Sequence, residues 1–259
     1  MKCLPKKIGI IGTGHLAGFL VEGMVKSGAD CEFTLSPRGA QTAASLTEKF
    51  GAKIGTDNQS VIDVSDLIII AVLPDIAKNV LEGLKFTNSQ VVLSTMAGVS
   101  HATMSELVSP ASTACTMMPG LSNSLGIGPS ILYPNNPVAE SFLKALGPVH
   151  TFTDWNSYQT ASVFGGFSGN TFIFMKQIID WFISQGLDDI TAKNLIAETL
   201  RGNAEALLQS PLSVDELIST VATPGGITAR GAISLKNDGA DKAWHDALNA
   251  ISQKIKSTQ

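Results

Sequence analysis

A short glycine turn near the N-terminus constrains the fold of this chain more than any other feature. Residues 12–17 read GTGHLA and directly follow the apolar run Ile8–Ile11, which is typical of a buried strand. The residues that come next, Leu16–Lys26, carry apolar side chains near one face of a predicted helix. A strand, a tight G-x-G-x-x-A turn and a helix, in this order, form the pattern of a dinucleotide-binding unit.

Each small residue of this turn has a physical task. Gly12 permits the tight turn, Gly14 removes a side chain so that a pyrophosphate can approach the backbone, and Ala17 lets helix and strand pack closely. The helix that begins here offers N–H groups and the positive end of its dipole to phosphates, which adds His15 and Leu16 to the candidate cofactor-binding residues. Two roles are open for His15, namely contact with phosphate or ribose and plain exposure to solvent.

The first half of the chain alternates apolar runs with amphipathic stretches. Strands are expected at residues 8–11, 32–35, 67–72, 91–94 and 114–117, with edge strands at 130–133 and 149–152. Helices are expected at residues 16–26, 40–50, 76–84, 102–108 and 138–146. The alternation predicts an α/β fold with an N-terminal Rossmann-like, doubly wound sheet.

Strand signals stop after about Asp154. Helical segments follow at residues 157–164, 168–185, 190–208, 214–221, 228–236 and 240–255. We therefore expect a dinucleotide-binding domain over residues 1–154 and an all-helical domain over residues 155–259. The segment Phe172–Ile183 is apolar on most of its circumference, so it is either a central helix within one subunit or a helix covered by a second copy.

The end of the second strand indicates which dinucleotide is bound. An NAD site usually has an acidic residue there for the ribose 2′-hydroxyl, whereas this chain reads Leu35-Ser-Pro-Arg38. Ser36 can donate a hydrogen bond and Arg38 can pair with a 2′-phosphate, which predicts a preference for NADP(H) with NAD(H) still possible. The alternative is a solvated turn, and Glu32 lies too early in the strand to reach the ribose.

Composition narrows the class of protein further. Of the 259 residues, 44% are hydrophobic and 15% are charged, and the net charge is -4, which fits a folded globule without a basic stripe for nucleic acid. The sequence has no run of about 20 apolar residues that would indicate a membrane span and no signal-peptide pattern. The cysteines Cys3, Cys31 and Cys115 are scattered, so we expect no disulfide framework, no metal site and a reducing, cytoplasmic location.

Five segments together resemble the pyrroline-5-carboxylate reductases, the enzymes of the last step of proline synthesis. They read IGIIGTGHLAG, SDLIIIAVLPD, STMAGVS, CTMMPGLSNSLGIG and VATPGGITARGAISL, and they are spread over almost the whole chain. The last is the most specific, because few dinucleotide folds carry TPGG-x-T between two C-terminal helices. The resemblance implies an NAD(P)H-dependent oxidoreductase that acts on a C=N bond, and a homodimer with interleaved C-terminal helices or a ring of such dimers.

The resemblance also implies roles for individual residues. It places further cofactor contacts at Val72, Leu73, Pro74, Ala97, Gly98 and Pro119. Thr223, Gly225 and Gly226 would bind the substrate carboxylate, and the two glycines can also expose backbone N–H groups beside a helix start, which suits an anion. Thr228 would hydrogen-bond the imine nitrogen as the catalytic residue, or it caps the helix that follows. Ser168 would contact the substrate, or it caps the long helix after it.

The loop after Met118-Pro119 departs from the family pattern and leaves the substrate open. Gly120, Leu121 and Ser122 stand where the family has Asn-Thr-Pro. The simplest function is reduction of a cyclic imino acid, 1-pyrroline-5-carboxylate, to proline. The alternatives are a reductase of a different imine, a β-hydroxyacid-dehydrogenase-like oxidoreductase in secondary metabolism, and a non-catalytic NADP(H)-binding sensor or interaction subunit.

Overall fold

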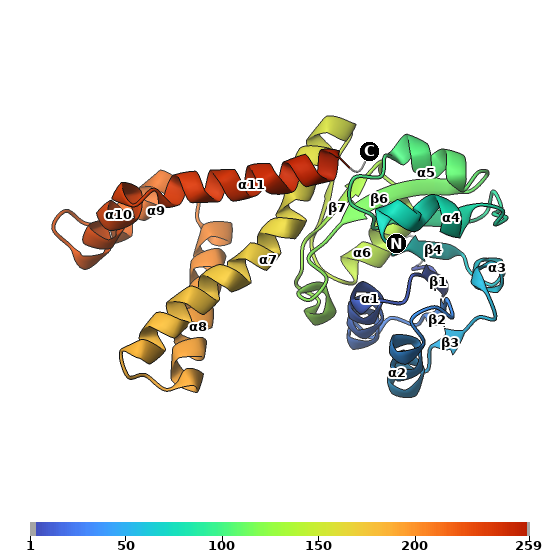
Figure 1. Ribbon diagram of the computed structural model, residues 1–259, viewed down its shortest axis with the longest axis horizontal. Helices are drawn as coiled ribbons and strands as arrows, with labels where there is room; N and C mark the ends of the chain where they lie inside the picture. Colours follow the sequence, from blue (N-terminus) through green and yellow to red (C-terminus); the bar gives the residue numbers. More distant parts are fainter. Residues whose placement is uncertain (1–3, 258–259) are drawn as a thin grey trace. The chain divides into compact units, whose positions relative to one another are not determined.

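A computed structural model describes residues 4–257, so Cys3 lies outside the described part of the chain (Figure 1). The chain divides into two compact units. The first contains residues 4–166 together with residues 251–257, and the second is Phe167–Ala250. The first is an α/β unit and the second is entirely helical, which confirms the predicted fold class.

The first unit is built on a single eight-stranded sheet in the order β3-β2-β1-β4-β5-β6-β7-β8. The first six strands pair in parallel, β7 is antiparallel to β6, and β8 is parallel to β7. The order of the first six is that of the doubly wound dinucleotide-binding fold. The strands are β1 Lys7–Ile11, β2 Glu32–Leu35, β3 Lys53–Ile54, β4 Leu67–Ile70, β5 Val91–Ser94, β6 Ser112–Met117, β7 Ser130–Tyr133 and β8 Val149–Thr151.

Helices cover both faces of this sheet (Figure 1). They are α1 His15–Lys26, α2 Ala40–Phe50, α3 Asn58–Asp63, α4 Ala77–Leu81, α5 His101–Leu107 and α6 Pro137–Lys144. Ile69 of β4 packs in the cluster that contains residues of α1, α2 and α6, and its neighbours Ile68 and Ile70 pack in the cluster that contains residues of α3, α4 and α5. All four β4 side chains are buried, and each contributes about 2 kcal/mol through removal of apolar surface from water. This burial explains why β4 reads as one continuous apolar run.

Three local expectations for the first unit need correction. Residues 130–133 form an interior strand, and not an edge strand, because β7 pairs with β6 on one side and with β8 on the other. The expected helix over 76–84 is a short 3-10 turn, Pro74–Ile76, followed by α4, and Gly83 turns the chain with φ +80°. The short elements β3 and α3 were not expected; β3 is two exposed residues long and carries no periodic signal.

The helices after β8 are longer than the sequence predicts. The segments expected over 157–164 and 168–185 form one helix, and the later helices lie close to the expected ranges. They are α7 Trp155–Ser184, α8 Asp189–Gln209, α9 Val214–Val221, α10 Ile227–Asn237 and α11 Ala240–Lys256. Despite this length, none of the helices within residues 4–257 has an apolar stretch that could cross a membrane.

Two glycines inside α7 permit close packing against the helix. A Cβ on Gly165 would lie 2.6 Å from Sδ of Met117, and a Cβ on Gly166 would lie 2.9 Å from Cγ2 of Ile251. The two glycines therefore allow β6 and α11 to approach the helix closely. Glycine is usually unfavourable inside a helix, but here the close packing compensates for it.

Gly23 of α1 is a second position where the absence of a side chain permits a close contact. A Cβ there would lie 2.7 Å from the carbonyl oxygen of Asn123 and 2.6 Å from Cδ2 of Leu146. Gly18 lies in the same helix, and a Cβ there would meet no described atom within 4 Å. The same substitution should therefore have opposite effects at the two positions.

We expect Gly23→Ala to lower the free energy of unfolding by about 2 kcal/mol, because the methyl group would meet a backbone oxygen that cannot move freely. Gly18→Ala should raise the free energy of unfolding by about 0.5–1 kcal/mol, since alanine is the better helix former. Urea denaturation followed by circular dichroism would measure both values. Equal effects at the two positions would contradict the packing of α1 described above.

Candidate dinucleotide-binding site

The glycine turn joins the end of β1 to the start of α1. Gly12 has φ +102°, and a Cβ there would lie 2.4 Å from the carbonyl oxygen of Ala71, so only glycine fits. Gly14 is the N-cap of α1 and makes no side-chain capping bond, and a Cβ there would meet no described atom within 4 Å. The first N–H groups of α1 are thus open to an anion, and the space above Gly14 suits a pyrophosphate.

A cavity of about 220 Å³ lies beside this turn, at the carboxyl ends of β1, β2 and β4. The cofactor-binding residues predicted from the sequence that line it are Gly12, Gly14, Ser36, Arg38 and Val72. Thr13, Gly39 and Asn58 line it as well. Ligands of open α/β folds bind at this edge of the sheet, so the cavity is the candidate site for the adenosine half of a dinucleotide.

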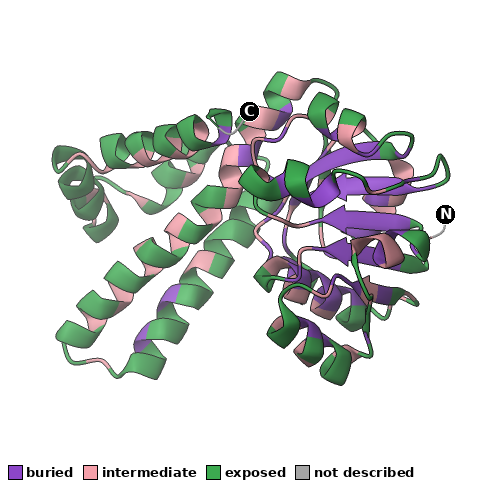
Figure 2. Ribbon diagram, turned by 45° about the vertical axis from the view of Figure 1, so that its right-hand side comes forward, coloured by how far each residue is buried: buried purple, intermediate pink, exposed green. Residues whose placement is uncertain are grey.

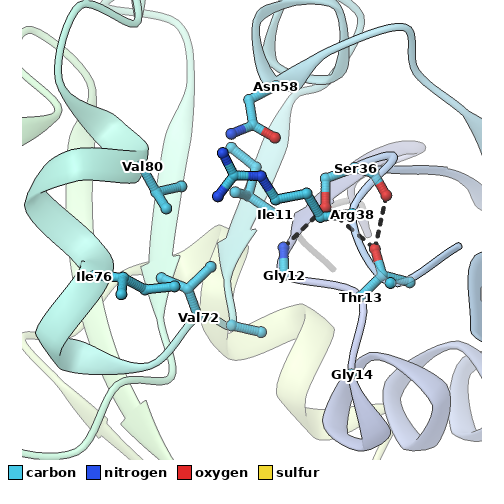
Figure 3. A pocket seen from close by; sticks show the side chains of 12 residues that line it. Ile11, Gly12, Thr13, Gly14, Ser36, Arg38, Asn58, Val72, Ile76 and Val80 are labelled. Atoms are coloured by element: carbon cyan, nitrogen blue, oxygen red, sulfur yellow. Dashed lines mark hydrogen bonds between the residues drawn. The ribbon is translucent and has the colours of Figure 1, made fainter.

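Ser36 and Thr13 hold the end of β2 against the glycine turn (Figure 3). The N–H of Gly12 donates to Oγ of Ser36 at 3.0 Å, and Oγ1 of Thr13 donates to the carbonyl oxygen of Ser36 at 2.9 Å. The two hydroxyl oxygens are 3.2 Å apart. Only 1% of the surface of Ser36 and 6% of that of Thr13 is exposed. We call these two residues and their hydrogen bonds the hydroxyl clasp.

Arg38 is the cation of the site. It is exposed, and its guanidinium points across the cavity toward Asn58 (Figure 3). Within residues 4–257 no carboxylate lies within ion-pair distance of it. Glu32 lies at the other end of β2 and pairs with Lys53 at 2.5 Å; this hydrogen bond holds the pKa of Glu32 below its ordinary value. The arrangement leaves Arg38 free to meet an anion.

Asn58 was missed by the sequence reasoning. It is the first residue of α3, whose N-cap Asp57 accepts a hydrogen bond from the N–H of Ser60 at 2.7 Å, while Oγ of Ser60 accepts one from the N–H of Asp57 at 3.2 Å. The Asp-x-x-Ser spacing of this capping box was the available signal. Because α3 is only six residues long, periodicity gave no indication of it.

The remaining predicted cofactor residues do not line the cavity. Ala17 lies on the buried face of α1 and is fully buried. On the first turn of the same helix, His15 is exposed and Leu16 is half-buried. The others follow the carboxyl ends of β4, β5 and β6, neighbouring parallel strands whose ends meet at one edge of the sheet; they are Leu73, Pro74, Ala97, Gly98 and Pro119. Their contacts with a cofactor stay a prediction.

The loop that departs from the family pattern, residues 120–128, is stabilised by hydrogen bonds between its own residues. Gly120 has φ +80°, and its N–H donates to Oδ1 of the fully buried Asn123 at 2.9 Å. Nδ2 of Asn123 donates to the carbonyl oxygen of Gly128 at 2.7 Å. Leu121 and Ile127 are exposed to 46% and 68%. The loop therefore has a defined shape of its own and presents apolar side chains.

The predicted substrate residues lie in the helical unit. Gly225 has φ +79°, and the N–H of Gly226 donates to the carbonyl oxygen of Thr223 at 2.9 Å. Gly226, and not Thr228, is the N-cap of α10, so the capping role considered for Thr228 is wrong. Gly226 makes no side-chain cap, so this helix start also has open N–H groups, with Thr228 exposed on the first turn.

Ser168 lies within α7, so it does not cap a helix as one interpretation held. Its carbonyl oxygen accepts a hydrogen bond from Oγ1 of Thr171 at 2.6 Å, and its side chain is half-buried.

The described cysteines are free thiols, and burial raises the pKa of Cys31 to about 11 and that of Cys115 to about 12. Within residues 4–257 no three His, Cys, Asp or Glu side chains gather as a metal site would require.

Known proteins resemble the chain in both of its units. Residues 159–258 match the family of pyrroline-5-carboxylate reductase dimerisation domains, and residues 7–98 match a family described as NADP oxidoreductase coenzyme F420-dependent. A pyrroline-5-carboxylate reductase of Methanosarcina acetivorans is 28% identical, with 97% of each chain covered. Pyrroline-5-carboxylate reductase 3 of Danio rerio is 27% identical, with 96% of this chain and 90% of the relative covered.

Solved structures agree on the fold. The 1-pyrroline-5-carboxylate reductase of Streptococcus pyogenes superposes with a TM-score of 0.85 at 22% identity, over 98% of this chain and 99% of the other. The pyrroline carboxylate reductase of Plasmodium falciparum, solved with NADP bound, gives 0.85 at 23% identity, over 98% of each chain. Fold and glycine turn thus define a dinucleotide-dependent oxidoreductase. Over nearly its whole length the chain is similar to pyrroline-5-carboxylate reductases.

We expect Arg38→Ala to weaken NADPH binding by about ten- to a hundredfold, because the 2′-phosphate loses a charge-assisted partner. NADH binding should stay nearly unchanged, since NADH has no phosphate at that position. Titration calorimetry with both dinucleotides would measure the two dissociation constants. The control is Lys49→Ala, which removes an exposed cation of α2 outside the cavity. Equal losses for NADPH and NADH would rule out the assigned role of Arg38.

Proposed function

We propose that this protein reduces a cyclic imino acid with NADPH, most simply 1-pyrroline-5-carboxylate to proline. The observation that carries the proposal is the similarity to pyrroline-5-carboxylate reductases over 97% of the chain. The open start of α1 above Gly14 supports the cofactor, and so does Arg38, which has no ion-pair partner within residues 4–257. The loop Thr223–Thr228 supports the substrate, because it combines exposed backbone N–H groups with a hydroxyl.

The reaction asks little acid–base chemistry of the protein. Reduced nicotinamide, when bound, supplies the hydride. The chain must bind the substrate carboxylate, orient the C=N bond and donate a hydrogen bond to its nitrogen. We assign the carboxylate to Thr223 and to the N–H groups of Gly225 and Gly226, at the positive end of α10. Thr228 donates to the imine nitrogen, and Ser168 is a further contact to the substrate.

A homodimer, alone or within a ring of dimers, is part of the same proposal. The ribbon of the helical unit is coloured almost entirely as exposed or intermediate (Figure 2). Ala192 and Ile196 are its buried hydrophobic residues, whereas many larger apolar side chains are exposed. Examples are Phe172, Ile173, Trp181, Leu208, Ile227 and Leu235. A unit with so little core of its own needs a partner to cover these side chains. Light scattering should therefore give at least twice the mass of one chain, and a monomer would contradict the proposal.

We place the protein in the cytoplasm. Cys31 and Cys115 are free thiols, which suits a reducing compartment.

A second candidate function is reduction of a different, more apolar imine. It is favoured by the loop Gly120–Gly128, in which Leu121 and Ile127 are exposed.

The loss of NADPH absorbance in the presence of 1-pyrroline-5-carboxylate tests the proposed function directly. We expect turnover with this substrate and faster oxidation of NADPH than of NADH. Turnover confined to other cyclic imines would favour the second candidate. Tight binding of NADPH without turnover of any imine would favour a non-catalytic sensor or interaction subunit and would overturn the proposal.

The same assay tests the role of Thr228. We expect Thr228→Ala to lower turnover about a hundredfold, because the imine nitrogen loses its hydrogen-bond donor. Thr228→Ser keeps the hydroxyl and should retain most of the activity. The affinity for NADPH should be unchanged in both variants. Unchanged turnover in Thr228→Ala would remove this residue from the mechanism.

A further inference from the structure

We infer that Asn123 is a positioning residue for the nicotinamide half of the cofactor, because it holds the chain at Pro119 and Gly120, whereas the adenosine half binds without it. The inference rests on the proposed binding of NADP(H). Asn123 begins a short 3-10 turn, Asn123–Leu125, in the loop Gly120–Gly128 that follows β6. None of its surface is exposed, and a buried amide is stable only where its polar atoms have partners.

The amide of Asn123 joins the two ends of this loop. Its Oδ1 accepts the N–H of Gly120 at 2.9 Å, and its Nδ2 donates to the carbonyl oxygen of Gly128 at 2.7 Å. These partners fix which way the amide faces, because an N–H needs an acceptor and a carbonyl oxygen needs a donor. Nδ2 also lies 3.3 Å from Oγ of Ser130, at the start of β7. One side chain thus ties the chain after β6 to the start of β7.

Neighbouring backbone leaves this amide little room to move. A Cβ on Gly128 would lie 2.5 Å from the backbone nitrogen of Asn123 and 2.6 Å from its Cγ. A Cβ on Gly147, just before β8, would lie 2.2 Å from the carbonyl oxygen of Gly128. On the other side, Gly23 of α1 packs against the carbonyl oxygen of Asn123. The loop is therefore enclosed between α1 and the turn before β8.

Gly120, which Asn123 holds, also packs against the first turns of α1. A Cβ on it would lie 3.0 Å from Cδ2 of Phe19 and 3.3 Å from Cδ1 of Leu16. Its carbonyl oxygen accepts the N–H of Ser124 at 3.1 Å, so both polar backbone groups of Gly120 are bonded within the loop. The course of the chain just after Pro119 is thus set by contacts within the protein.

The place of this segment in the sheet indicates which half of the cofactor it serves. A doubly wound sheet binds one half of a dinucleotide on each side of the point where the strand order reverses, which lies here between β1 and β4. The adenosine cavity extends to β2, so the nicotinamide half falls on the side of β5 and β6. The adenosine half has a separate support, because the hydroxyl clasp joins Gly12, Thr13 and Ser36 to one another. A loosened loop should therefore disturb the nicotinamide half and leave the adenosine half in place.

The test compares NADPH with 2′,5′-ADP, which has the adenosine half and its 2′-phosphate but no nicotinamide. Titration calorimetry well below the melting temperature of each variant would give both dissociation constants. We expect Asn123→Ala to weaken NADPH about tenfold and to lower turnover of 1-pyrroline-5-carboxylate about tenfold, with the affinity for 2′,5′-ADP unchanged. Asn123→Ser should show the same pattern, because its hydroxyl stops at the position of Cγ and falls one bond short of the partners of the amide.

The matched control is Asn136→Ala, the same change at another place in the first unit. Asn136 is the N-cap of α6, and its Oδ1 accepts the N–H groups of Val138 and Ala139 at 3.0 and 3.1 Å. Loss of this cap should lower the melting temperature. The two affinities and the turnover should stay unchanged, which separates a loss of stability from a loss of position.

An unchanged ratio of the two dissociation constants in Asn123→Ala would overturn the inference. If both affinities were retained and the melting temperature alone fell, Asn123 would be merely structural. If both fell together, the loop would support the adenosine half as well. Should Asn123→Ala not fold, Asn123→Ser decides between the same outcomes. In the unsubstituted protein, rapid exchange of the Gly120 amide hydrogen with solvent would also overturn the inference, because Asn123 would then not hold it.

The proposed function and this inference fail in different ways. If the unsubstituted protein binds NADPH but reduces no imine, the proposed reaction fails, and the two dissociation constants still decide the role of Asn123. If it binds NADPH no more tightly than 2′,5′-ADP, the nicotinamide half adds nothing to binding, and the inference fails whatever the turnover assay gives. If it binds neither compound, both are wrong.

Discussion

The close approach of Gly12 to the carbonyl oxygen of Ala71 is the contact on which the rest of the site depends. It brings the chain after β1 against the chain after β4, with no room for a side chain between them. The turn can then start α1 at the sheet edge where the parallel strands end, and the open N–H groups of α1 face that edge. The cavity lies beside this contact, and Arg38 lines it from the segment that follows β2.

The two units of the chain obtain their stability in different ways. The first buries its sheet between helices on both faces and has a core of its own. The second has little more than Ala192 and Ile196 inside and leaves large apolar side chains uncovered. The proposed substrate loop, Thr223–Thr228, belongs to the second unit. The dinucleotide cavity thus lies in a unit with a core of its own, whereas the proposed substrate loop lies in a unit with little core.

Local sequence patterns predicted much of the fold and part of the candidate site. The glycine turn, β4 and the change to helices after Asp154 were all evident, because each depends on residues close together in the sequence. The interior place of β7 and the continuity of α7 were not evident. They depend on the pairing of distant strands and on contacts of Gly165 and Gly166 with residues far away in the sequence. Likewise, the environment of Ser36 depends on Thr13, 23 residues earlier.

The candidate site combines a buried, neutral pair of hydroxyls with an exposed cation. Ser36 and Thr13 hold the turn through their hydrogen bonds, and in the proposed function Arg38 meets the phosphate charge that distinguishes NADPH from NADH. A neutral pair can be buried at low cost because each polar atom has a partner, whereas a buried guanidinium would need a carboxylate that would compete with the phosphate. Within residues 4–257 the exposed Arg38 has no carboxylate at ion-pair distance that would compete in this way. Selectivity can therefore change at Arg38 while the turn keeps its shape.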